Sequence, residues 1–119
     1  MPKGERKEER DCVKALVRAM ERNSPDYIIE IDTDFAGLRH KSKYDFYVSY
    51  AGYIVFVEAK MESAPLSDWQ RMFQLRCERA RTRFVVLRFS ASGKTFTCTG
   101  VNGVHSVATF KAEKFFAKR

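Results

Sequence analysis

The stretch YDFYVSYAGYIVFVEAK, residues 44–60, decides the fold, because it predicts two strands joined by a tight turn. If Ala51 and Gly52 are the two turn residues, strand pairing places Asp45 directly opposite Glu58. Residues opposite each other in an antiparallel pair share one face of the sheet, with Cβ atoms roughly 4.5–5.5 Å apart. The sequence therefore predicts two carboxylates side by side on one strand face.

A divalent cation is the usual partner of two carboxylates held this close. Without a cation, Asp45 and Glu58 would repel each other, and Mg²⁺ prefers oxygen ligands of this kind. Lys60 follows Glu58 by two residues and so points to the same face. The rest of this strand is apolar on both faces, and buried charges need a partner, which favours a site over two solvated surface acids. Two acids and a lysine are typical of metal-assisted phosphodiester hydrolysis.

The composition is that of a small basic globular protein. The chain has 119 residues, which predicts one domain over residues 1–119, and 45% hydrophobic content argues against disorder. A net charge of +7 favours anionic partners, nucleic acid first and acidic membrane surfaces second. Three cysteines without a CxxC spacing argue against disulfides and zinc, as expected of a reduced cytoplasmic compartment. No apolar run approaches the roughly 20 residues of a transmembrane helix, so no membrane association is expected.

Hydrophobic periodicity predicts the remaining elements. Apolar residues at helical spacing indicate helices over residues 5–22, 66–80 and 111–118. Short apolar runs indicate strands besides the hairpin, over residues 27–31, 83–89, 94–99 and 104–110. This order predicts an α/β fold with a mixed central sheet flanked by helices.

The second predicted helix carries a further polar candidate on its buried side. Its predicted buried stripe consists of Leu66, Trp69, Phe73, Cys77 and Ala80. Ser67 precedes Gln70 by three residues, which is the spacing of a capping box. Gln70 also lies in line with the buried stripe, where a bare amide is costly, so it is a candidate for the site as well. The two roles do not exclude each other.

This order of elements, with Asp45 and Glu58-Ala59-Lys60 on adjacent strands, resembles the PD-(D/E)XK nuclease superfamily over most of the chain. Tyr44 stands in the place of the proline in that motif. Residues 3–11, with Lys3-Gly4 and Glu9-Arg10-Asp11, are similar to the N-terminal segment of archaeal-type Holliday-junction resolvases. Residues 58–70, with the Leu-Ser-x-x-Gln helix start, are similar to the VRR-NUC domain nucleases.

The resemblance implies a restriction-endonuclease-like αβββαβ core and a metal site at the hairpin acids. In such a site Asp45, Glu58 and the backbone carbonyl of Ala59 bind Mg²⁺, with Mn²⁺ as a substitute. A glutamate of the first helix completes the site by resemblance to the resolvases. Glu9 is the residue expected there, while the nearby acids are competitors, namely Glu5 and Glu8.

The same resemblance assigns roles to the remaining polar candidates. Lys60 is expected to orient the attacking water or to neutralise charge that develops on the phosphate. Gln70 is expected to contact the phosphate or that water. Residues of the preceding basic loop are expected to grip the DNA backbone, namely Arg39, His40, Lys41 and Lys43. Six arginines are candidates to extend this basic surface, and they are Arg71, Arg76, Arg79, Arg81, Arg83 and Arg88.

The expected activity is that of a Mg²⁺-dependent DNA endonuclease that acts on branched DNA such as Holliday junctions, in DNA recombination and repair. Because a resolvase makes paired nicks, the resemblance also implies a homodimer, for which the terminal phenylalanines are candidates, with core packing as the alternative: Phe110, Phe115 and Phe116. The expected location is the cytoplasm, with association with the nucleoid and a phage- or virus-encoded origin as open alternatives.

Two alternatives remain open at the level of sequence. The first is a non-catalytic nucleic-acid-binding module on the same fold, with the basic surface but no productive metal site. The second keeps the nuclease chemistry and changes the substrate to linear, nicked or flapped DNA, because a fold does not fix a function.

Overall fold

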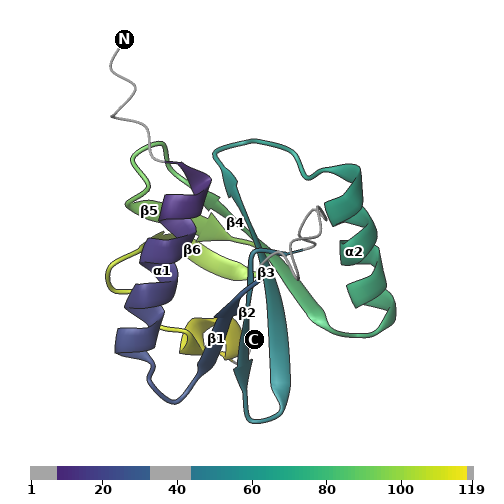
Figure 1. Ribbon diagram of the computed structural model, residues 1–119, viewed down its shortest axis with the longest axis horizontal. Coiled ribbons are helices and arrows are strands. Elements are labelled where there is room, and N and C mark those ends of the chain that lie inside the picture. The colour runs from purple at the N-terminus through teal and green to yellow at the C-terminus, as the bar shows by residue number, and fades with distance from the viewer. Residues whose placement is uncertain (1–7, 33–43, 118–119) are drawn as a thin grey trace.

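The computed structural model describes residues 8–32 and 44–117 (Figure 1). These residues form three helices, which are α1 (Glu9–Asn23), α2 (Asp68–Arg79) and α3 (Glu113–Phe116). They also form six strands, which are β1 (Ile28–Ile31), β2 (Phe46–Tyr50), β3 (Tyr53–Met61), β4 (Arg83–Phe89), β5 (Thr95–Cys98) and β6 (Val101–Ser106). The predicted order of helices and strands is confirmed.

The strands of the described residues build one six-stranded sheet, in which they lie in sequence order from β1 to β6. Neighbouring strands are antiparallel except β3 and β4, which are parallel. A parallel pair needs a long crossover connection, and α2 supplies it. The predicted α/β architecture with a mixed sheet is therefore confirmed.

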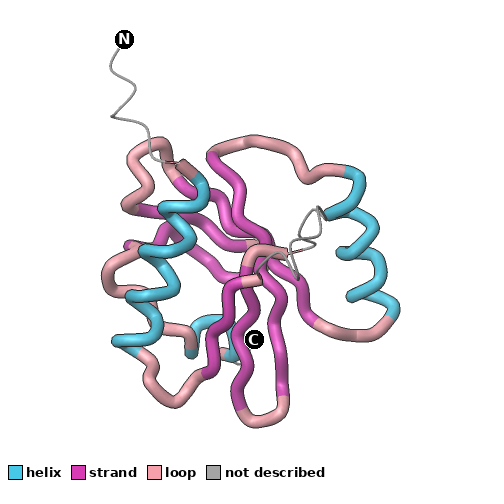
Figure 2. The backbone as a smooth tube through the Cα atoms, in the orientation of Figure 1, coloured by secondary structure: helices cyan, strands magenta, loops and turns pink. Residues whose placement is uncertain are grey.

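The turn between β2 and β3 has the predicted register. Tyr50 pairs with Tyr53, so Ala51 and Gly52 are the two turn residues. Their φ angles are 53° and 85°, and positive φ at both central residues defines a type I′ turn, which matches the natural twist of a hairpin. Figure 2 shows this turn at one end of the sheet and the connection from β3 to α2 at the other end.

The strand β3 extends beyond its antiparallel neighbour. Because β2 begins at Phe46, which pairs with Val57, the segment from Glu58 to the end of β3 pairs with β4 alone among the described strands. On the open edge, the carboxylate of Asp45 substitutes for a strand partner and accepts a hydrogen bond from the N–H of Ala59, with an N···O distance of 2.7 Å. This open edge gives a helix end room to approach β3.

The helices α1 and α2 cover opposite faces of the sheet. The core side chains of β3 are Val55, Val57 and Ala59, and they are buried together with the apolar stripe of α1, namely Cys12, Val13, Leu16, Val17 and Met20. On the other face, the ring of Phe56 packs against Phe73 of α2 with centroids 5.2 Å apart. Alternate residues of β3 therefore belong to two different layers, as the period of a strand requires.

Several details differ from the sequence-based expectation. Trp69 is 40% exposed rather than part of the buried stripe of α2, because Phe73 and Cys77 occupy that side of the helix. Ala80, also predicted in the stripe, is exposed and caps the end of α2. The sequence predicts the last strand over residues 104–110, but β6 spans Val101–Ser106, since the turn falls at residues 99–100.

The C-terminal segment packs on the same face of the sheet as α1. Phe110 and Phe115 are buried in the core, and Phe116 packs against it, so core packing accounts for the terminal phenylalanines rather than a subunit contact. Ser24, at the end of α1, donates to Glu113 at 2.6 Å and accepts from the N–H of Ala112 at 2.9 Å. These bonds attach α3 to α1 and satisfy a hydroxyl that is itself buried.

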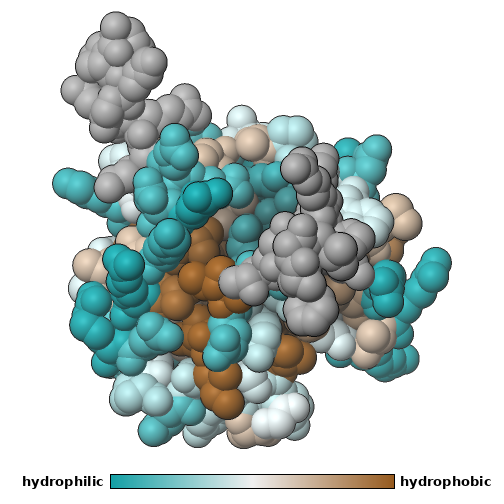
Figure 3. Space-filling model, in the orientation of Figure 1, coloured by the Kyte–Doolittle hydropathy of each residue, from teal (hydrophilic) through white to brown (hydrophobic). Residues whose placement is uncertain are grey.

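The edge strand β1 leaves apolar side chains exposed. Figure 3 shows hydrophobic residues between α1 and β1, beside the hydrophilic outer face of the helix. Ile28 and Ile31 are the exposed aliphatic residues of this strand.

Within the described residues, every helix is too short or too polar to cross a membrane.

Candidate metal centre

Three carboxyl groups from three different elements meet beside the open edge of β3. Glu9 lies in the first turn of α1, Asp45 directly precedes β2, and Glu58 lies within β3. One carboxylate oxygen of each lies within 4.8 Å of the others, close enough to share a metal ion. Glu58 is only 2% exposed, and the other two are half-buried. The alternative that the hairpin acids are solvated on the surface does not fit Glu58, because its side chain is buried.

The geometry of α1 explains how Glu9 joins acids that lie 36 and more residues further along the chain. The first half of α1 runs beside the C-terminal end of β3, where the Cys12 sulfur lies 4.0 Å from the sulfur of Met61. Glu9 is three residues before Cys12, so it lies on the same side of the helix, one turn closer to its N-terminus. The structure therefore brings together Glu9, rather than its exposed neighbour Glu8, with the hairpin acids.

Asp45 occupies a position slightly different from the predicted one. Its N–H donates to the carbonyl of Val57 at 2.8 Å, so it departs from the simple pairing opposite Glu58. Its carboxylate still reaches β3, because it accepts the hydrogen bond from the N–H of Ala59. Asp45 thus lies beside Glu58 as predicted, but its position is fixed by a side-chain bond rather than by the strand ladder alone.

Gln70 forms the predicted capping box and also lies at the acid cluster, while its predicted contact to a phosphate or water stays a prediction. Its Oε1 accepts from the N–H of Ser67 at 2.8 Å, and its own N–H donates to the Ser67 hydroxyl at 3.1 Å, which completes the capping box of α2. Its Nε2 donates to Oε2 of Glu58 at 2.7 Å. Because the cap uses the amide oxygen, the amide nitrogen is the atom turned toward the acid cluster. The start of α2 therefore orients the carboxyl group of Glu58.

The pKa values of the three acids are raised because the single positive charge of Lys60 does not offset their burial and mutual repulsion. Burial raises the pKa of Glu58 to about 9, and the negative charge of Asp45 and a hydrogen bond to its carboxyl group act in the same direction. The positive charge of Lys60 opposes these effects. Glu58 therefore keeps its proton at neutral pH in the absence of a cation, because ionising it would place a second charge beside Asp45 in a buried site.

The other two acids are perturbed in the same sense. Burial raises the pKa of Asp45, while the bond from Ala59 and the charge of Lys60 partly offset this effect. Burial and the charge of Asp45 raise the pKa of Glu9, again against Lys60. A strongly perturbed cluster of acids with one cationic neighbour is a functional-site candidate on physical grounds. A divalent cation would supply the positive charge that the cluster lacks and would allow all three acids to ionise.

Not all predicted site residues can be placed. The basic loop residues Arg39, His40, Lys41 and Lys43, and the competitor Glu5, lie outside the described residues. Ala59 is placed by its N–H bond to Asp45, while its carbonyl as a metal ligand stays a prediction. Lys60 pairs with Arg88 in the β3–β4 register, and its charge acts on all three acids.

Two supporting contacts were not evident from the sequence. Arg88, a predicted candidate for the basic surface, donates to the carbonyls of Glu62 and Ala64 at 3.1 and 2.7 Å, and so fixes the connection from β3 to α2. Tyr44, in the place of the proline in the motif, lies against Phe56 and Phe73 with ring centroids 4.7 and 5.6 Å away. No local pattern signals either contact, because the partners come from separate elements.

No protein family model matches the sequence, and comparison with curated proteins gives no match.

Proposed function

We propose that the protein is a metal-dependent DNA endonuclease that hydrolyses phosphodiester bonds, on a restriction-endonuclease-like core of the PD-(D/E)XK type. The observation that carries the proposal is the buried Glu58 beside Asp45 and Glu9, with Lys60 in the same electrostatic field. A purely structural role does not explain why three acids are gathered where each raises the cost of ionising the next.

The donor set fits Mg²⁺, with Mn²⁺ as a substitute, because all candidate ligands are oxygens. Asp45, Glu58 and Glu9 would hold the ion, and the Ala59 carbonyl is the further proposed ligand. When bound, such an ion polarises a phosphate oxygen and lowers the pKa of a coordinated water.

The remaining residues act on the substrate or on the ligands. Lys60 places a positive charge where the phosphate gains negative charge during attack, which is the kind of interaction that stabilises a transition state. Gln70 holds the carboxyl group of Glu58 in one orientation through its Nε2 donor. Second-layer bonds of this type keep a ligand ready to coordinate.

DNA is the proposed substrate, since the net charge of +7 favours a polyanion. Branched DNA is proposed on the resemblance to junction resolvases, with linear, nicked or flapped DNA as the alternative. Exposed arginines at the C-terminal end of α2 and just beyond it offer contacts to phosphates, namely Arg79 and Arg81.

Paired cutting of a junction calls for a homodimer, and the outer face of α2 offers a self-complementary surface for it. Trp69, Met72 and Leu75 form an exposed apolar stripe there, 40%, 57% and 54% exposed. If two α2 helices cross antiparallel at Met72, then Trp69 meets Leu75 of the partner, and the exposed Asp68 meets the exposed Arg76. A two-fold interface requires this reciprocity.

The dimer surface can be tested by a cysteine on the proposed axis. Met72→Cys should form a disulfide-linked dimer on mild oxidation, whereas Glu78→Cys, exposed on the same helix but off the stripe, should not. The three native cysteines are buried and should not compete. Equal cross-linking of both variants, or a monomeric mass in sedimentation, would refute this interface.

The nuclease proposal is tested by incubating the protein with Mg²⁺ and a labelled four-way junction or the matched linear duplex. We expect cleavage that Glu58→Ala abolishes while DNA binding persists, and that Glu21→Ala, at an exposed acid of α1, leaves unchanged. Paired nicks at the junction support a resolvase-like substrate, and equal cutting of both DNAs supports the linear alternative. Undiminished cleavage by Glu58→Ala would refute the assignment of the site.

The non-catalytic binding module remains the second candidate. It predicts tight DNA binding with no cleavage in Mg²⁺ or Mn²⁺. It also predicts no metal-induced rise in melting temperature, whereas a native-state metal site stabilises by mass action.

A further inference from the structure

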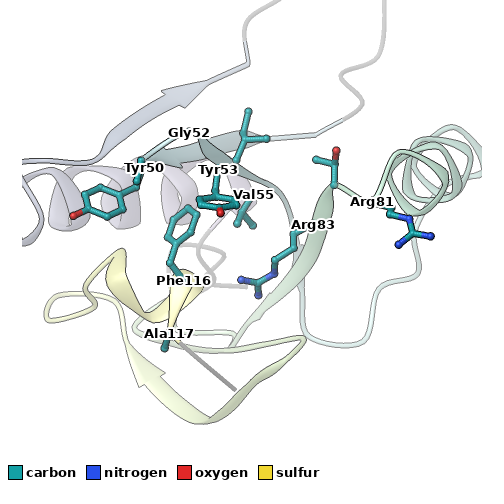
Figure 4. Close-up of a pocket in the computed structure, with 11 residues that line it drawn as sticks. Tyr50, Gly52, Tyr53, Val55, Arg81, Arg83, Phe116 and Ala117 are labelled. Carbon is teal, nitrogen blue, oxygen red and sulfur yellow. The ribbon is translucent and has the colours of Figure 1, made fainter.

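A second concave site lies at the end of β3 away from the acids. It is a hollow of about 630 Å³, within the range of ligand pockets. Its walls come from the β2–β3 turn, from the start of β4 and from α3, as Figure 4 shows. The charged residues among its described lining residues are two arginines, Arg81 and Arg83, and no acid is among them. An anionic ligand is therefore the one that its charge fits.

Aromatic side chains form the other part of the wall. Tyr53 is 72% exposed and Tyr50 is 43% exposed, both unusually open for large aromatic residues. Tyr50 stacks on Tyr27 with ring centroids 4.2 Å apart and planes at 14°, and the ring of Phe116 lies 6.3 Å from that of Tyr50. Figure 4 shows Tyr50, Tyr53 and Phe116 on one side of the view and the arginines on the other. An exposed tyrosine ring beside an arginine suits a ligand with a flat ring and a phosphate.

Arg81 has a backbone conformation that favours glycine. Arg81 follows the end of α2 with a φ of 57°, in the left-handed region that glycine occupies most easily. An arginine at this position is held at a cost in stability that a glycine would avoid. Arg83 is anchored from the other side, because its guanidinium donates to the carbonyl of Phe115.

We propose that this hollow binds single-stranded DNA, with an unpaired base stacked on the ring of Tyr53, a phosphate beside Arg83 and a further phosphate of the same strand at Arg81. Aromatic platforms next to basic side chains bind single strands with little sequence preference. Paired bases do not fit this mode, because the faces of a base in a duplex are already stacked. The use of such a site in cleavage rests on the proposed nuclease function, but the binding itself does not.

The test is the binding of a labelled ten-residue oligothymidylate in EDTA, followed by fluorescence anisotropy, so that no metal or cleavage is involved. We expect Tyr53→Ala to weaken binding about tenfold, and Tyr53→Phe, which keeps the ring, to bind within twofold of the parent. Val104→Ala, at a residue of similar exposure on β6, is the control and should not change binding. Equal affinity of Tyr53→Ala and the parent protein would overturn the proposal.

A second variant separates binding from folding. Arg81→Gly should raise the melting temperature, because glycine adopts the left-handed backbone without strain, and should still weaken oligothymidylate binding and lower its salt dependence. Arg71→Gly is the charge-matched comparison on α2, and it should bind more tightly than Arg81→Gly. If the two variants bind equally, the hollow has no specific role.

Two further measurements fix the ligand. An equal loss of duplex and single-strand binding in Tyr53→Ala would overturn stacking in favour of a general basic surface. Thymidine monophosphate that binds as tightly as the oligomer would overturn a strand in favour of a free nucleotide. If the parent protein binds the oligomer but cuts no DNA, the nuclease proposal fails while this one stands. If Tyr53→Ala binds the oligomer and cuts DNA as the parent protein does, this proposal fails while the nuclease proposal stands.

Discussion

The two ends of β3 differ in charge and in the way the chain is held there. The far end is the C-terminal half of β3, toward Met61. Acids gather there around Glu58, where β2 no longer pairs with β3. The near end, beside Tyr53, is a regular hairpin whose hollow carries aromatic rings and arginines. One strand thus presents an acidic end and an end with basic and aromatic side chains. The difference teaches that strand pairing fixes the near end, whereas side chains complete the far end.

The largest effect should come from removing one carboxylate at the far end. Asp45→Asn keeps an oxygen that can accept the hydrogen bond from Ala59, so the fold should persist. Cleavage should fall by about 10³-fold or more, because a neutral amide neither holds the cation nor supports its charge. The measurement is the single-turnover rate in Mg²⁺.

Asp26→Asn is the matched control for that experiment, since Asp26 is exposed and lies outside the acid cluster. A rate for Asp45→Asn within threefold of the parent would mean that the far end of β3 is not the catalytic end.

The next effect is a dependence of stability on pH in the absence of metal. The folded pKa of Glu58 is about 9 against 4.5 in the unfolded chain, so the folded protein keeps a proton that the unfolded chain has lost. Stability should therefore be unaffected by this group below pH 4.5, and should fall between pH 4.5 and 9 by up to about 1.4 kcal/mol per pH unit. The measurement is urea unfolding in EDTA at several pH values.

Glu58→Gln should flatten this pH dependence, and Glu21→Gln should not. Mg²⁺ should reverse the trend, because binding of the cation releases the proton, so the affinity for Mg²⁺ should increase with pH. A stability profile with the same slope in Glu58→Gln and the parent would show that the acids at the far end are not coupled by burial.

A smaller effect should follow from loosening Glu58 without changing its charge. Gln70→Ala removes both the bond to Glu58 and part of the capping box, and should lower metal affinity or activity about 10- to 100-fold. Ser67→Ala is the matched variant, because it damages the same cap, by about 1 kcal/mol, and leaves the bond to Glu58 in place. Metal titration of both variants separates the two roles, and equal losses of affinity would assign Gln70 to the cap alone.

The smallest effect should come from the turn at the near end. Gly52 has a φ of 85°, and among the described residues no neighbour would crowd an added Cβ, so Gly52→Ala should cost about 1–2 kcal/mol through backbone strain alone. Ala51→Asn should act in the opposite direction, because Asn-Gly is favoured in a type I′ turn. Thermal unfolding measures both changes. Mg²⁺ affinity should not change in either variant, and a linked loss would show that the two ends of β3 are not independent.

The sequence predicted the near end of β3 well and the far end in part. Turn chemistry and alternation are local signals, so Ala51-Gly52 and the pairing of Tyr50 with Tyr53 could be predicted from neighbouring residues. The same alternation correctly separated Val57 from Glu58. The position of Trp69 was predicted wrongly, because helical periodicity shows that a stripe is apolar but not which apolar stripe faces the sheet.

The contacts among separate elements could not be predicted in this way. The distance from Tyr53 to Phe116 is 63 residues along the chain, and no spacing connects them. The bond from Gln70 to Glu58 depends on how the β3–α2 connection bends, which Arg88 fixes through two carbonyls. Such contacts depend on the packing of whole elements rather than on local propensity.

The sequence by itself determined the strand order around the hairpin, the capping box at Ser67 and the placement of two acids near one another, because each follows from a period or a turn over a few residues. Tertiary structure decided that Glu9 completes the acid cluster, that Glu58 is buried enough to hold a proton, and that aromatic rings and arginines share one hollow. Burial and proximity between elements arise when helices pack on a sheet, and they are not properties of any short segment.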